Sequence, residues 1–138
     1  MRPIRYLLLS LFLLLAACSN KPGLSASEKN YFRNMSEAHT ELAMLDSLSQ
    51  SNKFAKARYQ EAVSQMKPKT KILLLRFKGT EYEKYDSYKA TVDAFQSYLT
   101  AEDMWEQNKG LVLVNKRLAE GNGSLKKAQE LIKQEQSR

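Results

Sequence analysis

An uncharged apolar stretch close to the start of the chain constrains how the rest can fold. The stretch covers the eleven residues Leu7–Ala17 and follows the basic residues Arg2 and Arg5. As a helix it would be roughly 16 Å long, which is about half of the hydrocarbon core of a bilayer. A basic start, a short apolar segment and small residues before a cleavage point are typical of a secretory signal peptide. The sequence therefore predicts a removable leader over residues 1–17 instead of a permanent membrane span.

Four residues at the cleavage point, Leu15-Ala16-Ala17-Cys18, resemble the lipobox of bacterial lipoproteins. The resemblance implies that the Cys18 thiol receives a diacylglycerol, that a signal peptidase cuts before Cys18, and that the new amino group is acylated. Three acyl chains would anchor the mature protein to a membrane, since two already give stable anchoring. Cys18 is the only cysteine, so the chain cannot form an internal disulfide.

The residue after the cysteine bears on the destination of such a lipoprotein. An aspartate there tends to retain lipoproteins of Gram-negative bacteria at the inner membrane, and this chain has Ser19 instead. The resemblance thus implies the outer membrane, on its periplasmic face. In a Gram-positive source the anchor would lie in the cell membrane.

The rest of the chain is long enough for one domain with its own core. Removing 17 of 138 residues leaves 121, and the loss of Arg2 and Arg5 leaves 20 basic and 15 acidic residues, a net charge of +5. This charge is moderate, so we do not expect a nucleic-acid partner. The whole chain has only five glycines and three prolines, which favours helices. We expect a lipidated tether over 18–26 and a helical domain over 27–136.

Apolar residues at intervals of three and four predict the helices of this domain. The first begins near Ser25, which has capping-box spacing to Glu28, and ends in the serine-rich residues 47–52. A second is expected over 52–66, because Pro68 should end or kink it. A third begins with a capping box at Thr80 and carries an apolar stripe that we expect in the core. The stripe consists of Tyr85, Tyr88, Val92, Phe95 and Leu99.

Two short apolar runs, 72–77 and 111–114, are compatible with either strand or helix, because periodicity does not separate the two. We assign helix to 72–77, with Gly79 as its C-cap, because no second convincing strand is available to pair with it. A short helix is expected over 111–119, a turn at 121–123 and a last helix capped by Ser124. The predicted fold is all-α: a small antiparallel bundle of four to five helices behind the leader.

Motifs for catalysis or metal binding are not evident in this chain. His39 is the only histidine, and it lies on the apolar stripe of the first helix without a nucleophile motif or a second metal ligand beside it. Residues 121–123 lack the spacing of a phosphate-binding loop. The acidic residues fall on predicted exposed helix faces. We therefore expect no catalytic residue, no metal and no cofactor.

Charge divides unevenly between two consecutive segments. Residues 53–78 carry eight basic residues and one acid, whereas residues 80–107 carry seven acids and two lysines. The simpler interpretation is that two neighbouring helices complement each other. The alternative is a basic patch that binds lipid headgroups or another anionic envelope polymer, exposed by a kink at Pro68. Its candidate binding residues are Lys67, Lys69, Lys71, Arg76 and Lys78.

Three aromatic residues, Tyr82, Tyr98 and Trp105, fall outside the stripe of the third helix and are candidates for an interface. We expect a non-catalytic lipoprotein that binds or positions another envelope protein, in an assembly, accessory, immunity or exclusion role. Its expected partners are the membrane, through acylated Cys18, and an envelope protein. The alternative is a binding module for an anionic polymer or lipid headgroups at residues 53–78. An enzyme would be supported only by turnover that is lost on His39→Ala.

Overall fold

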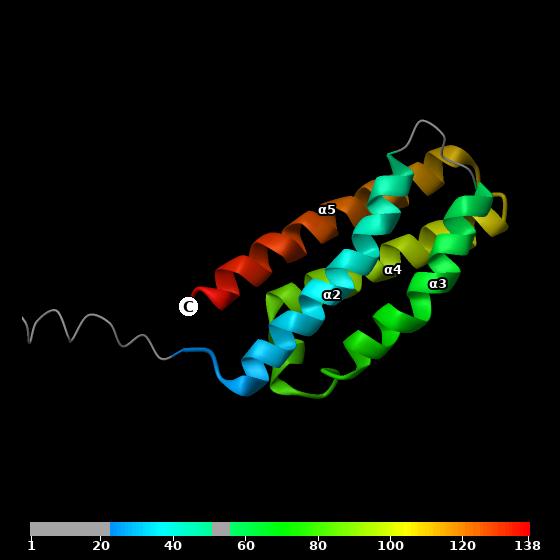
Figure 1. The fold of residues 1–138 in the computed structure, drawn as a ribbon. Coiled ribbons are helices and arrows are strands. Elements are labelled where there is room, and N and C mark those ends of the chain that lie inside the picture. The colour runs from blue at the N-terminus through cyan, green and yellow to red at the C-terminus, as the bar shows by residue number, and fades with distance from the viewer. Residues whose placement is uncertain (1–22, 51–55) are drawn as a thin grey trace, which may run out of the picture.

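The structure, a computed structural model, describes residues 23–50 and 56–138 (Figure 1). Within these ranges it contains four α-helices, one short 3-10 helix and no strand. The helices are α2 (Ala26–Ser49), α3 (Lys56–Leu75), η1 (Glu81–Lys84), α4 (Asp86–Glu106) and α5 (Leu111–Gln136). The four α-helices alternate in direction along one long axis. The prediction of a small antiparallel all-α bundle is therefore confirmed, while the leader and Cys18 lie outside the described residues.

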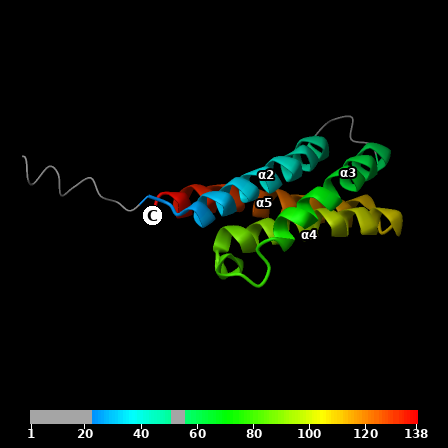
Figure 2. The ribbon, with the colours of Figure 1, turned by 60° about the horizontal axis from the view of Figure 1, so that its bottom comes forward.

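The bundle consists of two helical hairpins packed on each other. Figure 2 shows α2 over α5 and α3 over α4, so the four helices form a closed ring of neighbours. α4 and α5 contact each other most extensively, whereas α3 and α4 contact each other much less. No helix in the described ranges is long and apolar enough to cross a membrane. The largest fully buried side chains are Tyr31, Tyr59, Tyr98, Phe32, Met35, Leu42, Leu45 and Met66.

The start of α2 follows the predicted capping box. The Ser25 hydroxyl accepts a hydrogen bond from the Glu28 amide at 3.1 Å, and the Ser25 amide donates to the Glu28 carboxylate at 2.7 Å. Both bonds give an acceptor to a backbone amide that has no partner within the helix at its start. The hydrogen bonds from Ser25 also lower the pKa of the Glu28 carboxyl. A local sequence pattern is sufficient to predict this cap, because Ser25 and Glu28 lie within one helical turn of each other.

The predicted end of the second helix at Pro68 is wrong, because α3 continues through the proline to Leu75. A proline inside a helix costs about 3 kcal/mol, since it removes one backbone hydrogen bond and crowds the preceding turn. Pro68 is exposed, while residues on both sides of it, including Met66 and Leu73, are buried. Burial of the flanking turns offsets the cost. The helix predicted over 72–77 is correct as far as Leu75, where α3 ends, and residues 76–79 form a turn.

The capping box predicted at Thr80 is also wrong. Residues Glu81–Lys84 form η1, and α4 begins only at Asp86. The Thr80 hydroxyl donates to the Phe77 carbonyl at 2.7 Å, and the Glu83 carboxylate accepts from the Gly79 amide at 2.7 Å. Gly79 has a φ of +78°, which suits a glycine, but it is not the predicted C-cap, because α3 ends four residues earlier at Leu75.

The turn predicted at residues 121–123 is absent, because α5 is one continuous helix from Leu111 to Gln136. The run 111–114 is therefore helical and not a strand. Gly121 is buried against the ring of Tyr98, and the Tyr98 hydroxyl donates to the Asn122 side chain at 2.6 Å. The contact of Gly121 with α4 thus helps to keep this stretch helical, although the intrinsic preference of its two glycines would interrupt the helix.

Candidate functional site

A groove with a volume of about 490 Å³ runs between α3 and α4. Leu74, Tyr88 and Phe95 form its base and are 6–9% exposed. The adjoining side chains of α4 that line it, Val92 and Leu99, are only partly buried. These residues give the groove a continuous apolar floor that remains open to solvent.

The outer edge of the groove also exposes apolar side chains. Leu75, which lines it, is 52% exposed, and Ile72, one turn earlier on α3, is 56% exposed. The spacing of three residues places both on the same side of the helix. The apolar surface of the groove therefore extends onto the outer face of α3.

The basic rim of the groove comes from α3 and from the turn that follows it. Lys67 and Lys71 are four residues apart on one face of α3, Lys78 lies in the turn after Leu75, and all three line the groove. Ion pairs between described residues involve Lys69, Lys89 and Arg117, so none of these three rim lysines has a carboxylate partner among them.

Two carboxylates lie near the ends of this lysine row. Glu83 lines the groove itself. Burial raises the pKa of the Glu102 carboxyl, and the positive charge of Lys67 opposes this effect. The middle of the groove, around Lys71, is lined by apolar side chains and the neutral Gln96. The groove therefore combines an apolar floor with positive charge along one side.

The predicted basic patch is divided between two sides of α3. Lys69 forms an ion pair with Glu41 of α2 at 3.5 Å, and the Arg76 guanidinium donates to the Asn34 side chain at 2.7 Å. Asn34 is buried, so Arg76 satisfies a polar group in the interior. The five candidate residues therefore do not share one surface, because Lys67, Lys71 and Lys78 line the groove while Lys69 and Arg76 contact α2.

No ion pair among the described residues joins α3 to α4, so no direct contact supports the interpretation that these oppositely charged helices complement each other. The start of α3 contacts the end of α4 through two hydrogen bonds: the Lys56 ammonium donates to the Trp105 carbonyl at 2.9 Å, and Gln60 donates to Glu106 at 3.4 Å. Lys67 and Lys71 lie on later turns of α3, and Lys78 lies just beyond it, where the groove is lined by apolar side chains of α4.

The prediction that Tyr82 and Tyr98 lie at a surface interface is wrong, because they are 7% and 0% exposed. The Tyr82 ring stacks on Tyr31 with 4.8 Å between centroids, and Tyr98 packs against Gly121. Trp105 is partly buried, with its ring 5.9 Å from that of Tyr59. The aromatic side chains of η1 and α4 mainly build the core.

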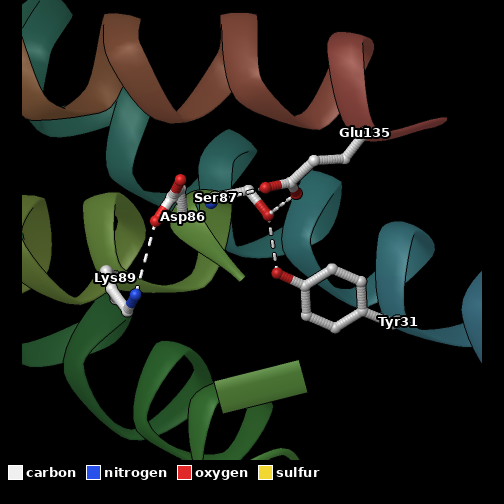
Figure 3. A network of polar contacts seen from close by, with 5 residues as sticks. All are labelled: Tyr31, Asp86, Ser87, Lys89 and Glu135. Atoms are coloured by element: carbon white, nitrogen blue, oxygen red, sulfur yellow. Dashed lines mark hydrogen bonds and ion pairs between the residues drawn. The ribbon is translucent and has the colours of Figure 1, made fainter. Parts of the chain in front are cut away.

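A buried polar network joins three helices at the end of the bundle where α2 and α4 begin and α5 ends (Figure 3). The Ser87 hydroxyl donates to the Glu135 carboxylate, and the Tyr31 hydroxyl lies 2.6 Å from the same serine oxygen. Since Ser87 has one hydroxyl proton, Tyr31 donates to Ser87. Burial raises the pKa of the Tyr31 hydroxyl. Ser87 is 0% exposed, so this hydroxyl is closed to a substrate and the network stabilises the bundle.

The remaining polar candidates form no recognisable reaction centre. His39 is partly buried and lines a shallow pocket between α2 and α5 with Lys133 and Gln129. Among the residues that the structure describes, no three histidine, cysteine or acidic side chains are grouped to hold a metal ion.

Sequence reasoning missed the apolar half of the groove. The predicted core stripe is confirmed for Tyr88 and Phe95, which are buried, while Tyr85, Val92 and Leu99 pack against the core and are only partly buried. Sequence spacing did not predict that the open side of Val92 and Leu99 lines a groove. The available signal was the run of four apolar residues 72–75, which covers more than one face of a helix. Comparisons of the chain with protein-family models, with curated proteins and with solved structures find no match.

Proposed function

We propose that this chain is a non-catalytic lipoprotein, anchored by acylated Cys18 at the periplasmic face of the outer membrane, that binds another envelope protein through the α3–α4 groove. The groove itself carries the proposal, since it combines exposed apolar side chains with lysines that lack carboxylate partners among the described residues. Contiguous apolar surface rimmed by polar groups is typical of interaction sites. A groove of this kind binds a partner without requiring any chemical step.

The position of the groove suits a protein that works close to a membrane. Gly23 is only five positions after Cys18, so the described chain begins at most about 18 Å from the anchor. η1, which carries Glu83 at one end of the groove, lies at the same end of the bundle as the start of α2 (Figure 1). A partner in the groove would therefore be held near the membrane surface. Assembly, accessory, immunity and exclusion roles are all compatible with this arrangement.

Site-specific photo-crosslinking in intact cells tests the proposal. A benzophenone amino acid at Leu75 lies at the groove, and the same group at Glu130 on the exposed side of α5 provides the control. We expect a discrete protein adduct in the membrane fraction from position 75 only. Adducts with lipid alone, or equal adducts from both positions, would contradict the proposal.

The second candidate is a binding module for an anionic lipid or polymer. The row of Lys67, Lys71 and Lys78 favours it, because positive charge without ion pairs attracts phosphates and carboxylates. This mode of binding would weaken steeply with salt and would not require the apolar floor. A Leu99→Ser substitution therefore separates the candidates, since it should weaken only the binding of a protein.

A further inference from the structure

We infer that the segment of the partner that occupies the α3–α4 groove is an acidic amphipathic helix of about three turns. The inference rests on the proposed function and specifies its partner. It follows from the length of the groove, from the apolar side chains of its floor and from the positive charge of its rim.

The length of the groove matches a short helix. Tyr88 and Leu99, which line it along α4, are eleven residues apart, or about 16 Å along the helix axis. A helix lying in such a groove inserts apolar side chains at intervals of three, four and seven residues. Three turns of helix place these side chains over Leu74, Phe95 and Leu99, which line the floor.

The charge of the rim determines which helix fits. Lys67, Lys71 and Lys78 would flank the apolar stripe of the partner on the α3 side. Acidic side chains on that flank would form new ion pairs, whereas basic side chains would be repelled. The α4 side contributes the neutral Gln96 at the same level. One flank of the partner helix should therefore be acidic, and the other flank can be neutral.

A second copy of this chain does not fit the groove. In a two-fold dimer the same surface meets itself, so each groove would face another groove and neither copy would present a protruding stripe to fill it.

An acyl chain fits the groove poorly as well. Small-molecule sites cover most of the surface of their ligand. The floor of this groove remains open, with Leu75 52% exposed, and would leave one side of an acyl chain in water. A helix solves this problem because it brings its own polar outer face.

Binding of synthetic peptides to the full acylated protein in phosphatidylcholine nanodiscs tests the inference. The probes are three fluorescein-labelled 14-residue peptides with a preference for helix. The first has a leucine stripe flanked by glutamates, the second has the same stripe flanked by lysines, and the third has the composition of the first in scrambled order. We expect the first peptide to bind at least tenfold more tightly than either of the others in fluorescence anisotropy.

Charge reversal at the groove provides the decisive comparison. The double variant Lys71→Glu with Lys78→Glu should reverse the preference, so that the lysine-flanked peptide binds more tightly than the glutamate-flanked one. The control variant, Lys126→Glu with Lys127→Glu, makes the same change on exposed positions of α5 and should keep the original preference. Because the control variant carries the same change of charge, a gain of binding by the lysine-flanked peptide in the groove variant alone reports the groove.

Three results would overturn the inference: equal binding of the scrambled peptide, no reversal in the groove variant, or a similar reversal in the control variant. Vesicles that contain phosphatidylglycerol test the membrane as the occupant. If their binding depends on Lys71 and Lys78 while the peptides do not discriminate, a lipid surface occupies the groove. If position 75 crosslinks to an envelope protein and the peptides still do not discriminate, the proposed function stands and this inference fails.

Discussion

The ring of Tyr98 in α4 packs against the backbone of Gly121 in α5 so closely that a Cβ at position 121 would lie 3.2 Å from two ring carbons. Tyr98 has little freedom to move away. Its hydroxyl donates to Asn122 at 2.6 Å, and its backbone carbonyl accepts from the Tyr59 hydroxyl at 2.9 Å. The tight packing of α4 on α5 therefore requires a residue without a side chain at position 121.

This contact predicts opposite effects for two glycines of the same helix. Alanine improves helix propensity by about 1 kcal/mol at either position. At Gly121 the new methyl group crowds the fixed Tyr98 ring, and overpacking of this kind costs about 1–3 kcal/mol. At Gly123 a Cβ meets nothing within 4 Å. We expect Gly121→Ala to lower the free energy of unfolding and Gly123→Ala to raise it, as measured by urea denaturation. Stabilisation of similar size by both would contradict the contact.

The same contact shows which parts of the fold the sequence could predict. The capping box at Ser25 was predicted correctly because all its partners lie within four residues. The glycines at 121 and 123, and the proline at 68, were interpreted by their intrinsic preferences as a turn and a helix end. Both helices continue because distant residues such as Tyr98 and the buried side chains around Pro68 stabilise them. Such contacts depend on how helices pair in space, which spacing along the chain does not specify.

The candidate site was predictable in part. The basic residues were identified from charge alone, and Lys67, Lys71 and Lys78 do line the groove. Helical spacing separates Lys67 and Lys71 from Lys69 once α3 is known to continue through Pro68, whereas Arg76 and Lys78 lie in the turn after Leu75, which that spacing does not describe. The floor was missed because Val92 and Leu99 have the same spacing whether they enter a core or an open groove.

A buried hydroxyl in α3 provides a second prediction. Thr70 is 0% exposed, and its hydroxyl oxygen has no hydrogen-bond partner among the described residues. Burying an unsatisfied polar group costs about 1–3 kcal/mol. Thr70→Val removes the hydroxyl and keeps a branched side chain of similar shape. We expect the free energy of unfolding to rise by about 1 kcal/mol in urea denaturation. A loss of stability would indicate that the hydroxyl has a partner.

The only histidine gives the protein a predictable pH dependence. Burial lowers the pKa of His39 below its ordinary value, with a smaller lowering from Lys133, while Asp46 acts in the opposite direction. A lowered pKa means that the unfolded state binds the proton more tightly. Stability should therefore be complete above about pH 6.5 and decrease as the pH falls through the folded-state pKa. NMR titration of His39 measures that pKa directly, and His39→Gln should remove this part of the pH dependence.

The lipobox predicts the chemistry of the N-terminus. Cys18→Ser removes the thiol that would receive the diacylglycerol, so the precursor should keep its leader and lack acyl chains. Mass spectrometry of the wild-type protein should show an acylated peptide that begins at Cys18. An unmodified thiol, or a mature N-terminus at another residue, would disprove the prediction. Ser19→Ala serves as the control, because it leaves the cysteine in place.

Glu135 near the end of α5 caps the start of α4. Its carboxylate accepts from the Ser87 amide at 3.2 Å and from the Ser87 hydroxyl. Ser87 is the second residue of α4, and the N-cap residue of that helix, Tyr85, provides no side-chain hydrogen bond. The amides of a first helical turn have no partner within the helix, and a negative charge there interacts favourably with the helix dipole. Glu135 therefore supplies, from another helix, the hydrogen-bond acceptor that the side chain of a Ser or Asp at the N-cap position usually supplies.

This cap predicts graded effects of two substitutions at one position. Glu135→Ala leaves the buried Ser87 hydroxyl and amide without their acceptor, so we expect a loss of about 1–2 kcal/mol, the usual cost of removing an N-cap. Glu135→Gln keeps an acceptor oxygen and removes the charge, so its loss should be smaller. Glu130→Ala is the control, since Glu130 is exposed on the same helix and its replacement should change stability by less than about 0.5 kcal/mol. Urea denaturation measures all three variants. Equal losses for Glu135→Ala and Glu130→Ala would mean that helix propensity alone, and not the cap on α4, determines the contribution of Glu135.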